Sequence, residues 1–195
     1  MKVASRRAIL TALVASSALA ATSAFSQSPD ATGELTPSCG NAPQPTRPQT
    51  EGPFFKSNSP LRSNLANDAP HGVKIILSGF VFNAACRPIP MSLIELWHAD
   101  DNGRYDNDGF KLRGHQFTDE IGRWQFSTIV PALYPGRTRH YHVKVQRPNG
   151  QTLTTQLYFP DEPQNRRDNI FDERLLLKID RSRDIASARF DFFID

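Results

Sequence analysis

The stretch YPGRTRHYHVKV, residues 134–145, concentrates the kinds of side chains that bind metals and move protons. It holds two of the five histidines and two of the four tyrosines of the chain. Because successive side chains of a β-strand point to opposite faces, we expect His140 and His142 to point the same way and Tyr141 the other way. A His-x-His pair on a strand can offer two imidazoles to one metal ion. The alternative is a pair of hydrogen-bonded surface groups.

Two tyrosines favour the metal interpretation. Tyr134 lies in a Pro-Gly turn just before the expected strand, and Tyr105 follows another turn, WHADDNG. A phenolate is a hard oxygen donor that suits Fe(III) better than Zn(II) or Cu(I), and tyrosine binds iron in some haem proteins. Two histidines with two tyrosines therefore indicate non-haem ferric iron. Zinc or copper is an alternative, although four-coordinate zinc sites rarely use tyrosine, and either tyrosine could instead be an amphipathic strand-end residue.

Short β-rich runs must position these residues. From residue 73 onward such runs are separated by Asn-Gly, Pro-Gly and Arg-Pro-Ile-Pro turn signals. They read VKIILSGFVF, SLIELWH, RWQFSTI, HYHVKVQ, RLLLKID and ARFDFFI. Their number and spacing predict an all-β fold, a β-sandwich with long loops. We expect the polar residues 160–169 to form a surface loop and His115 to lie in a loop near the site. The core candidates are Trp97, Trp124 and Phe126, while His98 is expected to be structural and His71 solvated.

The chain before the sandwich divides into two parts. Residues 1–26 have a basic start, an apolar stretch and small residues near the end, as in an export signal. Arg6 and Arg7 fit the twin-arginine form, and an ordinary secretory signal is the alternative. Residues 27–72 are rich in proline and predict an extended arm, followed by the sandwich domain at 73–195. We therefore expect a periplasmic or extracellular protein with no membrane span in its mature form.

Charge and cysteine content fit this organisation. Three basic residues within positions 1–26 account for the formal net charge of +3, and no acidic residue precedes Asp30. The remaining chain is near neutral and gives no sign of nucleic-acid binding. Roughly 170 residues after the signal suffice for one domain with a core. Cys39 and Cys86 are a disulfide candidate, because export leads to oxidising conditions; the alternative is two unpaired thiols.

Seven short segments occur in a fixed order between residues 50 and 160. They are TEGP at 50–53, LSGFV at 77–81, PIP at 88–90, IELWH at 94–98, GRY at 103–105, WQFST at 124–128 and YPGRTRHYH at 134–142. In this order the segments resemble the intradiol ring-cleavage dioxygenases, the group of protocatechuate 3,4-dioxygenase and catechol 1,2-dioxygenase. The resemblance is nearest to the small, exported, single-domain members of that family, which act in the catabolism of aromatic compounds.

The resemblance implies a reaction and a role for individual residues. A catecholic substrate would take up both atoms of O₂, and its ring would be cleaved between the hydroxylated carbons to give a muconate-type diacid. Arg137 would stabilise developing negative charge and contact the substrate, beside which Gln156 would also lie; as alternatives, Arg137 is a solvated turn residue or a salt-bridge partner. The implied Fe(III) ligands are Tyr105, Tyr134, His140 and His142. Of these, Tyr134 would also act as a general base.

The sequence departs from the family pattern at a few positions. Tyr141 replaces the usual aliphatic residue between the histidines, and Ala132-Leu133 precedes Tyr134 where Gly-Trp is commoner. Cys86 stands where a strict pattern has glycine or serine, and pairing with Cys39 would explain it. These changes concern packing and the pocket wall rather than the ligands.

Several alternatives stay open at the level of sequence. Catechol, protocatechuate and hydroxyquinol all fit as the substrate, and a homo-oligomer is compatible with the assembly of larger relatives. The alternative from another functional class is a non-catalytic transthyretin-like β-sandwich binding module. Such a module would have no reason to hold two tyrosines and a His-x-His pair in this arrangement.

Overall fold

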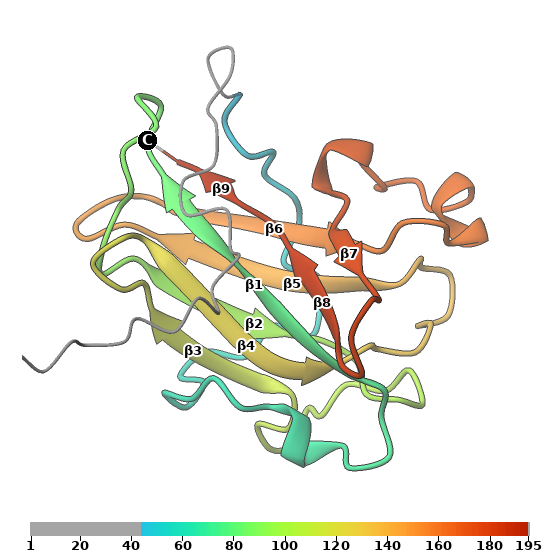
Figure 1. Cartoon of the computed structure of the whole chain (residues 1–195). Coiled ribbons are helices and arrows are strands. Elements are labelled where there is room, and N and C mark those ends of the chain that lie inside the picture. Colours follow the sequence, from blue (N-terminus) through green and yellow to red (C-terminus); the bar gives the residue numbers. More distant parts are fainter. Residues whose placement is uncertain (1–43, 195) are drawn as a thin grey trace, which may run out of the picture. The chain divides into compact units, whose positions relative to one another are not determined.

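The fold is built almost entirely of β-strands. The computed structural model describes residues 44–194 (Figure 1). The helical elements among these residues are three short 3-10 turns, η1 (Ala66–Asp68), η2 (Pro163–Arg166) and η3 (Glu173–Leu175). The predicted all-β class is therefore confirmed. Within the same range, no helix is long and apolar enough to cross a membrane.

Part of what the sequence predicts falls on residues 1–43. The export signal at 1–26 and Cys39 lie outside the described residues. The signal, its twin-arginine form and the Cys39–Cys86 disulfide therefore stay predictions, as do the domain boundaries at residues 26 and 72.

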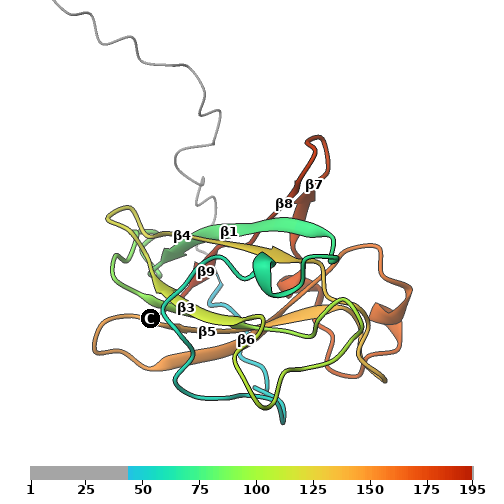
Figure 2. The ribbon, with the colours of Figure 1, turned by 90° about the horizontal axis from the view of Figure 1, so that it is seen from below.

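The strands form two sheets, which Figure 2 shows as two layers. The first sheet contains β1 (Lys74–Phe82), β4 (Arg123–Ile129), β7 (Lys178–Asp180), β8 (Ala186–Arg189) and β9 (Phe192–Phe193). In it, β1 pairs antiparallel with β4 and parallel with β8 and β9. The second sheet is antiparallel throughout, in the order β3 (Arg113–Phe117), β2 (Leu93–Trp97), β5 (His140–Gln146) and β6 (Thr152–Tyr158).

The hydrophobic core lies between the two sheets. On the first sheet, Leu77 is opposite Phe126 in the register of β1 and β4, and both side chains are fully buried. On the second sheet, Leu96 is opposite Val143 in the register of β2 and β5, and both are again fully buried. All four belong to one contiguous core. The alternation of apolar residues in these strands is thus explained by burial of one face of each sheet.

The outer face of β5 is covered as well, by the proline-rich arm. The backbone amide of Gln49 donates to the Thr154 carbonyl at 2.8 Å, which holds the arm against β6. Farther along, Lys144 forms an ion pair with Glu51 at 2.8 Å and lies over the Phe55 ring at 3.3 Å. The first residues of β5 are therefore buried on both faces. This coverage creates a shielded space where His140 and His142 point.

One local prediction is wrong, and another gains detail. His115 lies in strand β3 rather than in a loop. The short polar sequence RGHQF has little strand character of its own, and its pairing with β2 stabilises the strand. The predicted surface loop at 160–169 contains the 3-10 turn η2, and its Asp168 side chain is only 2% exposed. This segment folds back onto the turn that precedes β5.

Candidate metal centre

His140 and His142 lie on the arm-covered face of β5 and are both buried. Their Nε2 atoms approach to 3.1 Å. Tyr141 points to the opposite face, is fully buried in the core, and donates a hydrogen bond from its hydroxyl to the Ile129 carbonyl at 2.8 Å. The alternation predicted for HYH is therefore what the strand adopts, and Tyr141 is a packing residue.

The surroundings of His140 leave its Nε2 free to bind a metal through its lone pair. Its Nδ1 lies 2.6 Å from the Thr138 carbonyl, which can only accept a hydrogen bond, so Nδ1 carries the proton. Burial, and then the positive charge of Arg137, lower the pKa of His140 to about 4. The imidazole is consequently neutral at physiological pH, and a lone pair on Nε2 faces into the site.

The His142 ring is oriented by stacking, in addition to the contact of its Nε2 with His140 Nε2. Its ring is nearly parallel to the Trp97 indole, with centroids 5.0 Å apart and an angle of 8°. Burial, and then the proximity of His140, lower its pKa well below the ordinary value. Its Nδ1 is buried and has no hydrogen-bond partner among the described residues. This second imidazole is therefore also neutral and oriented by packing.

Tyr105 enters the site from the turn after β2. Asp100 shapes this turn, because its Oδ1 accepts hydrogen bonds from the backbone amides of Asn102 and Arg104 at 2.8 and 2.9 Å. The Tyr105 hydroxyl reaches to 3.3 Å from His140 Nε2. Burial raises the pKa of Tyr105. A cation beside the hydroxyl would oppose this effect and favour the phenolate.

Tyr134 comes from the segment between β4 and β5. Its ring lies edge-on to that of Tyr105, with centroids 5.9 Å apart. The arm residue Phe54 completes the aromatic group, since it stacks on Tyr105 at 4.6 Å and meets Tyr134 edge-on at 5.4 Å. No sequence signal points to Phe54, because it lies in TEGPFF and meets the tyrosines only after the arm folds over the sheet.

The donor set fits a hard metal cation. Two neutral imidazole nitrogens and a phenol oxygen gather within hydrogen-bond distance, and a second phenol packs beside the first. Across residues 44–194, no group of three or more histidine, cysteine, aspartate or glutamate side chains gathers to hold a metal. A metal held by His140, His142 and Tyr105 would have two imidazole nitrogens and a tyrosine oxygen as donors, and tyrosine oxygen suits Fe(III) better than zinc or copper.

Arg137 and Gln156 meet beside the histidines. In the antiparallel register, Gln156 of β6 is directly opposite His142 of β5. The Gln156 Oε1 accepts a hydrogen bond from Arg137 Nη2 at 2.6 Å, and its Nε2 donates to the Thr50 carbonyl at 2.9 Å. The amide thus links the arginine to the arm. The structure thus brings Arg137 and Gln156 together beside His142, and the hydrogen bond between the two side chains was not predicted.

Asp168 is, after Phe54, a second residue of the site that the sequence did not predict. Asp168 accepts a hydrogen bond from Arg137 Nε at 2.8 Å. It lies 31 residues from Arg137, in a polar segment that resembles any exposed loop. Arg137 is therefore a salt-bridge partner as well as a neighbour of the histidines.

A cavity adjoins two of the predicted site residues. It has a volume of about 350 Å³, adjoins Tyr134 and Arg137 and is also lined by Leu133 and Arg167. Leu133, where the sequence departs from the family pattern, is therefore a wall residue of this cavity.

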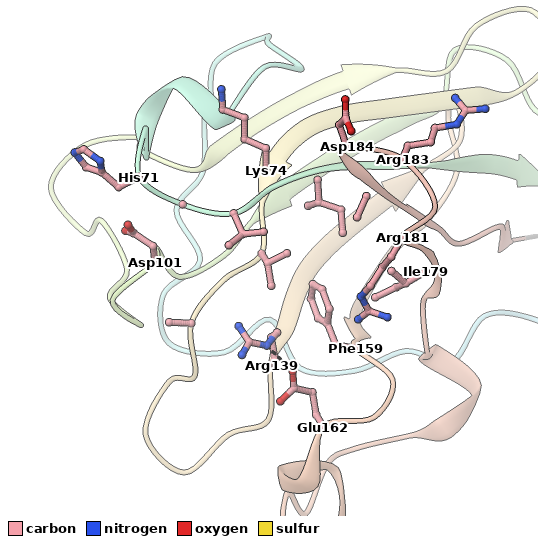
Figure 3. Close-up of a pocket in the computed structure, with 16 residues that line it drawn as sticks. His71, Lys74, Asp101, Arg139, Phe159, Glu162, Ile179, Arg181, Arg183 and Asp184 are labelled. Atoms are coloured by element: carbon pink, nitrogen blue, oxygen red, sulfur yellow. Dashed lines mark hydrogen bonds and ion pairs between the residues drawn. The ribbon is translucent and has the colours of Figure 1, made fainter.

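A second cavity, of about 700 Å³, is lined by Arg139, Phe159 and residues of the segments 71–75 and 179–186 (Figure 3). Figure 3 shows Arg139 directed toward Glu162, with which it forms an ion pair of 2.6 Å. None of the predicted metal-binding or catalytic residues lines this cavity. It is therefore separate from the candidate centre.

Comparison with known proteins identifies relatives of one kind. A family model described as Dioxygenase matches residues 50–195. Catechol 1,2-dioxygenase of Candida albicans is 28% identical over 148 residues, covering 62% of this chain and 49% of the relative. The protocatechuate 3,4-dioxygenase beta chain of Burkholderia cepacia is 31% identical over 131 residues, covering 56% and 54%. The chain spans about half the length of the curated relatives it matches.

Solved structures agree in fold. The dioxygenase domain of a dioxygenase carbohydrate-binding protein fusion from Streptomyces sp. SirexAA-E is 49% identical with a TM-score of 0.76, covering 78% of this chain and 99% of that one. Hydroxyquinol 1,2-dioxygenase of Pseudomonas putida DLL-E4 is 26% identical with a TM-score of 0.70, covering 78% and 67%. The family model covers well over half of the chain. The chain belongs to the intradiol ring-cleavage dioxygenase family.

Proposed function

We propose that this protein is a non-haem Fe(III) intradiol dioxygenase acting on a catechol. It incorporates both atoms of O₂ and releases a muconate-type diacid. Membership of the family supports the reaction class. The observation that carries the proposal is the convergence of the His140 and His142 Nε2 atoms with the Tyr105 hydroxyl, within 3.3 Å.

The iron would be held by the two histidines and the two tyrosines. The neutral state of both imidazoles supports this, because protonated imidazoles cannot bind a metal. Fe(III) held by these residues would supply Lewis-acid chemistry, withdrawing electron density from a bound catechol. The four ligands in this proposal are Tyr105, Tyr134, His140 and His142.

Residues of the chain itself would handle protons and charge. A catechol oxygen must lose its proton to bind a metal as an anion, and the Tyr134 oxygen would accept that proton as a general base. Arg137 offers a guanidinium beside the histidines and stabilises negative charge that develops on the substrate. Gln156 fixes one end of that guanidinium through its 2.6 Å hydrogen bond. Phe54 and Trp97 form apolar walls that exclude water from the centre.

The function can be tested on purified protein. We expect about one iron per chain by elemental analysis, a red-brown colour from tyrosinate-to-iron charge transfer, and O₂ uptake with at least one of catechol, protocatechuate and hydroxyquinol. His142→Ala should lose the iron and the colour together. A wild-type protein that stays colourless and iron-free after incubation with iron, and consumes no O₂, would contradict the proposal and favour a transthyretin-like binding module.

We propose also that the protein is exported. Support comes from the layout of residues 1–26, with Arg6 and Arg7 before an apolar stretch. Mass spectrometry of the protein from a cell fractionation tests this directly. A mature chain that begins near residue 27 in the periplasm or medium is the expected result, and an intact residue 1 in the cytoplasm contradicts it.

A further inference from the structure

Asp168 lies where two parts of the candidate centre meet. It follows the 3-10 turn η2, and its side chain is only 2% exposed. Its Oδ2 accepts hydrogen bonds from Arg137 Nε at 2.8 Å and from the Thr138 backbone amide at 2.9 Å. Its Oδ1 accepts from the Ile170 amide at 3.1 Å. The carboxylate is therefore fixed at both oxygens.

The first consequence concerns the direction of Arg137. The guanidinium is held at Nε by Asp168 and at Nη2 by Gln156 Oε1, so anchors at two corners fix its plane. An arginine next to a Pro-Gly turn would otherwise sample many rotamers, and ordering it on substrate binding would cost conformational entropy. The salt bridge makes that ordering part of the folded state, before any substrate arrives.

The second consequence concerns His140. The same carboxylate oxygen that binds Arg137 also binds the amide of Thr138, whose carbonyl accepts the Nδ1 proton of His140 at 2.6 Å. The Thr138 hydroxyl adds a hydrogen bond to Asn165 Oδ1 at 2.6 Å, which ties the same residue to the η2 turn. Thr138 is therefore clamped from both sides, and so is the carbonyl that orients the imidazole.

The Asp168 carboxylate is stabilised in its ionised form. Burial alone would raise the pKa of Asp168, but hydrogen bonds from the Thr138 amide, Arg137 and the Ile170 amide outweigh it and hold the pKa below the ordinary value. The carboxylate is thus charged at the pH at which Arg137 must be held.

We propose that Asp168 is a positioning residue of the centre, which orients Arg137 directly and His140 through the backbone of Thr138. The inference rests on the proposed function, because the two side chains that Asp168 orients are the proposed catalytic arginine and a proposed iron ligand. Asp168 itself would touch neither substrate nor metal.

A double-mutant cycle separates positioning from mere stability. In iron-loaded protein, Asp168→Asn is expected to lower kcat/KM at least 10-fold, whereas in an Arg137→Ala background the same change should cost less than 3-fold. Asp172→Asn is the matched control. Asp172, four residues farther along, precedes η3; it accepts a hydrogen bond from Arg174 at 2.6 Å and pairs with Arg47 at 3.6 Å. Within the described part of the chain, no contact with the histidines is formed by this carboxylate, so kcat/KM should stay within 2-fold of wild type. An equal loss from Asp168→Asn in both backgrounds would overturn the direct part of the proposal, that Asp168 acts through Arg137; the His140 part is tested by the second readout below.

A second readout does not depend on turnover. In the ¹⁵N-labelled full chain without added metal, the Arg137 Nε–H and His140 Nδ1–H signals should exchange slowly with solvent. Asp168→Asn should shift or broaden both, and Asp172→Asn neither. Fast exchange of Arg137 Nε–H in the wild type would overturn the proposal even if the variant did not fold. If the wild type consumed no O₂, the proposed function would fail, while these signals would still decide whether Asp168 orders the two side chains.

Discussion

Gly103 and Leu133 meet backbone to backbone, and this contact joins the two loops that carry the tyrosines. A β-carbon built on Gly103 would collide with the Leu133 carbonyl oxygen. Gly103 also has a φ of +76°, in the left-handed region that favours glycine. Tyr105 follows two residues after this contact, and Tyr134 is the next residue after Leu133. The spacing of the two phenol rings therefore depends on a position that tolerates no side chain.

Replacement of this glycine should disturb the fold and the centre together. Gly103→Ala is expected to destabilise the protein by about 3 kcal/mol, from left-handed strain plus the collision. Gly136→Ala is the matched control, because Gly136 has a φ of +79° and a β-carbon added there would meet nothing within 4 Å; it should cost only about 1 kcal/mol. Urea unfolding measures both. Equal losses would show that the Leu133 contact does not matter.

Removal of the Tyr134 hydroxyl should separate iron binding from proton transfer. Tyr134→Phe leaves three candidate ligands and the aromatic packing against Phe54 and Tyr105. We expect the iron to be retained, the visible band to shift, and kcat to fall by roughly 10²-fold through loss of the general base. Absorption spectra and steady-state kinetics measure these effects. An unchanged spectrum together with an unchanged kcat would remove Tyr134 from the mechanism.

Removal of the Arg137 charge should affect turnover and leave the metal in place. Arg137→Ala is expected to keep a normal iron content while kcat/KM falls by roughly 10²–10³-fold, the size of effect seen when a fixed charge at a reacting centre is lost. Arg123→Ala, at an exposed salt bridge of the first sheet, is the control and should behave as wild type. Wild-type kinetics for Arg137→Ala would mean that the guanidinium serves only the fold.

His98, which is not among the proposed ligands, should make stability depend on pH. It is fully buried; its Nδ1 lies 2.7 Å from the Ala99 carbonyl, and its Nε2 lies 2.7 Å from the Thr128 hydroxyl, so the neutral ring is satisfied at both nitrogens. Burial lowers its pKa to about 4 from 6.5. The unfolded chain thus binds the proton more readily between these values, and stability falls as the pH drops below 6.5.

The expected size of this effect can be measured by a comparison. Between pH 7.5 and pH 5.0, the free energy of unfolding of the wild type should fall by about 2 kcal/mol more than that of His98→Gln. Urea titrations at the two pH values supply the numbers. An identical pH dependence for both proteins would mean that His98 does not titrate as its burial implies.

The sequence predicts most of what depends on local spacing. The same-face placement of His140 and His142 and the opposite placement of Tyr141 follow from strand geometry, and β5 adopts them. The turn before Tyr105 is announced by Asp-Asp-Asn-Gly, whose Asp100 caps two backbone amides. The sandwich itself follows from the number of short apolar runs.

What the sequence does not predict depends on contacts between distant segments. Phe54 and Asp168 reach the centre only because the arm and the loop after β6 fold back over β5. Strand β3 is stabilised by pairing with β2, which its own residues do not reveal. Leu133 shares the wall of a cavity with Gln164, Arg167 and Asp168, and no local pattern in the sequence places these separate segments side by side.

The most direct test of the central claim is the product formed from a catechol under ¹⁸O₂ by the iron-loaded protein. Mass spectrometry should find a muconate-type diacid that carries two ¹⁸O atoms, because intradiol cleavage places one oxygen atom in each new carboxyl group. A semialdehyde opened outside the two hydroxylated carbons, or no labelled product from catechol, protocatechuate or hydroxyquinol, would contradict the account.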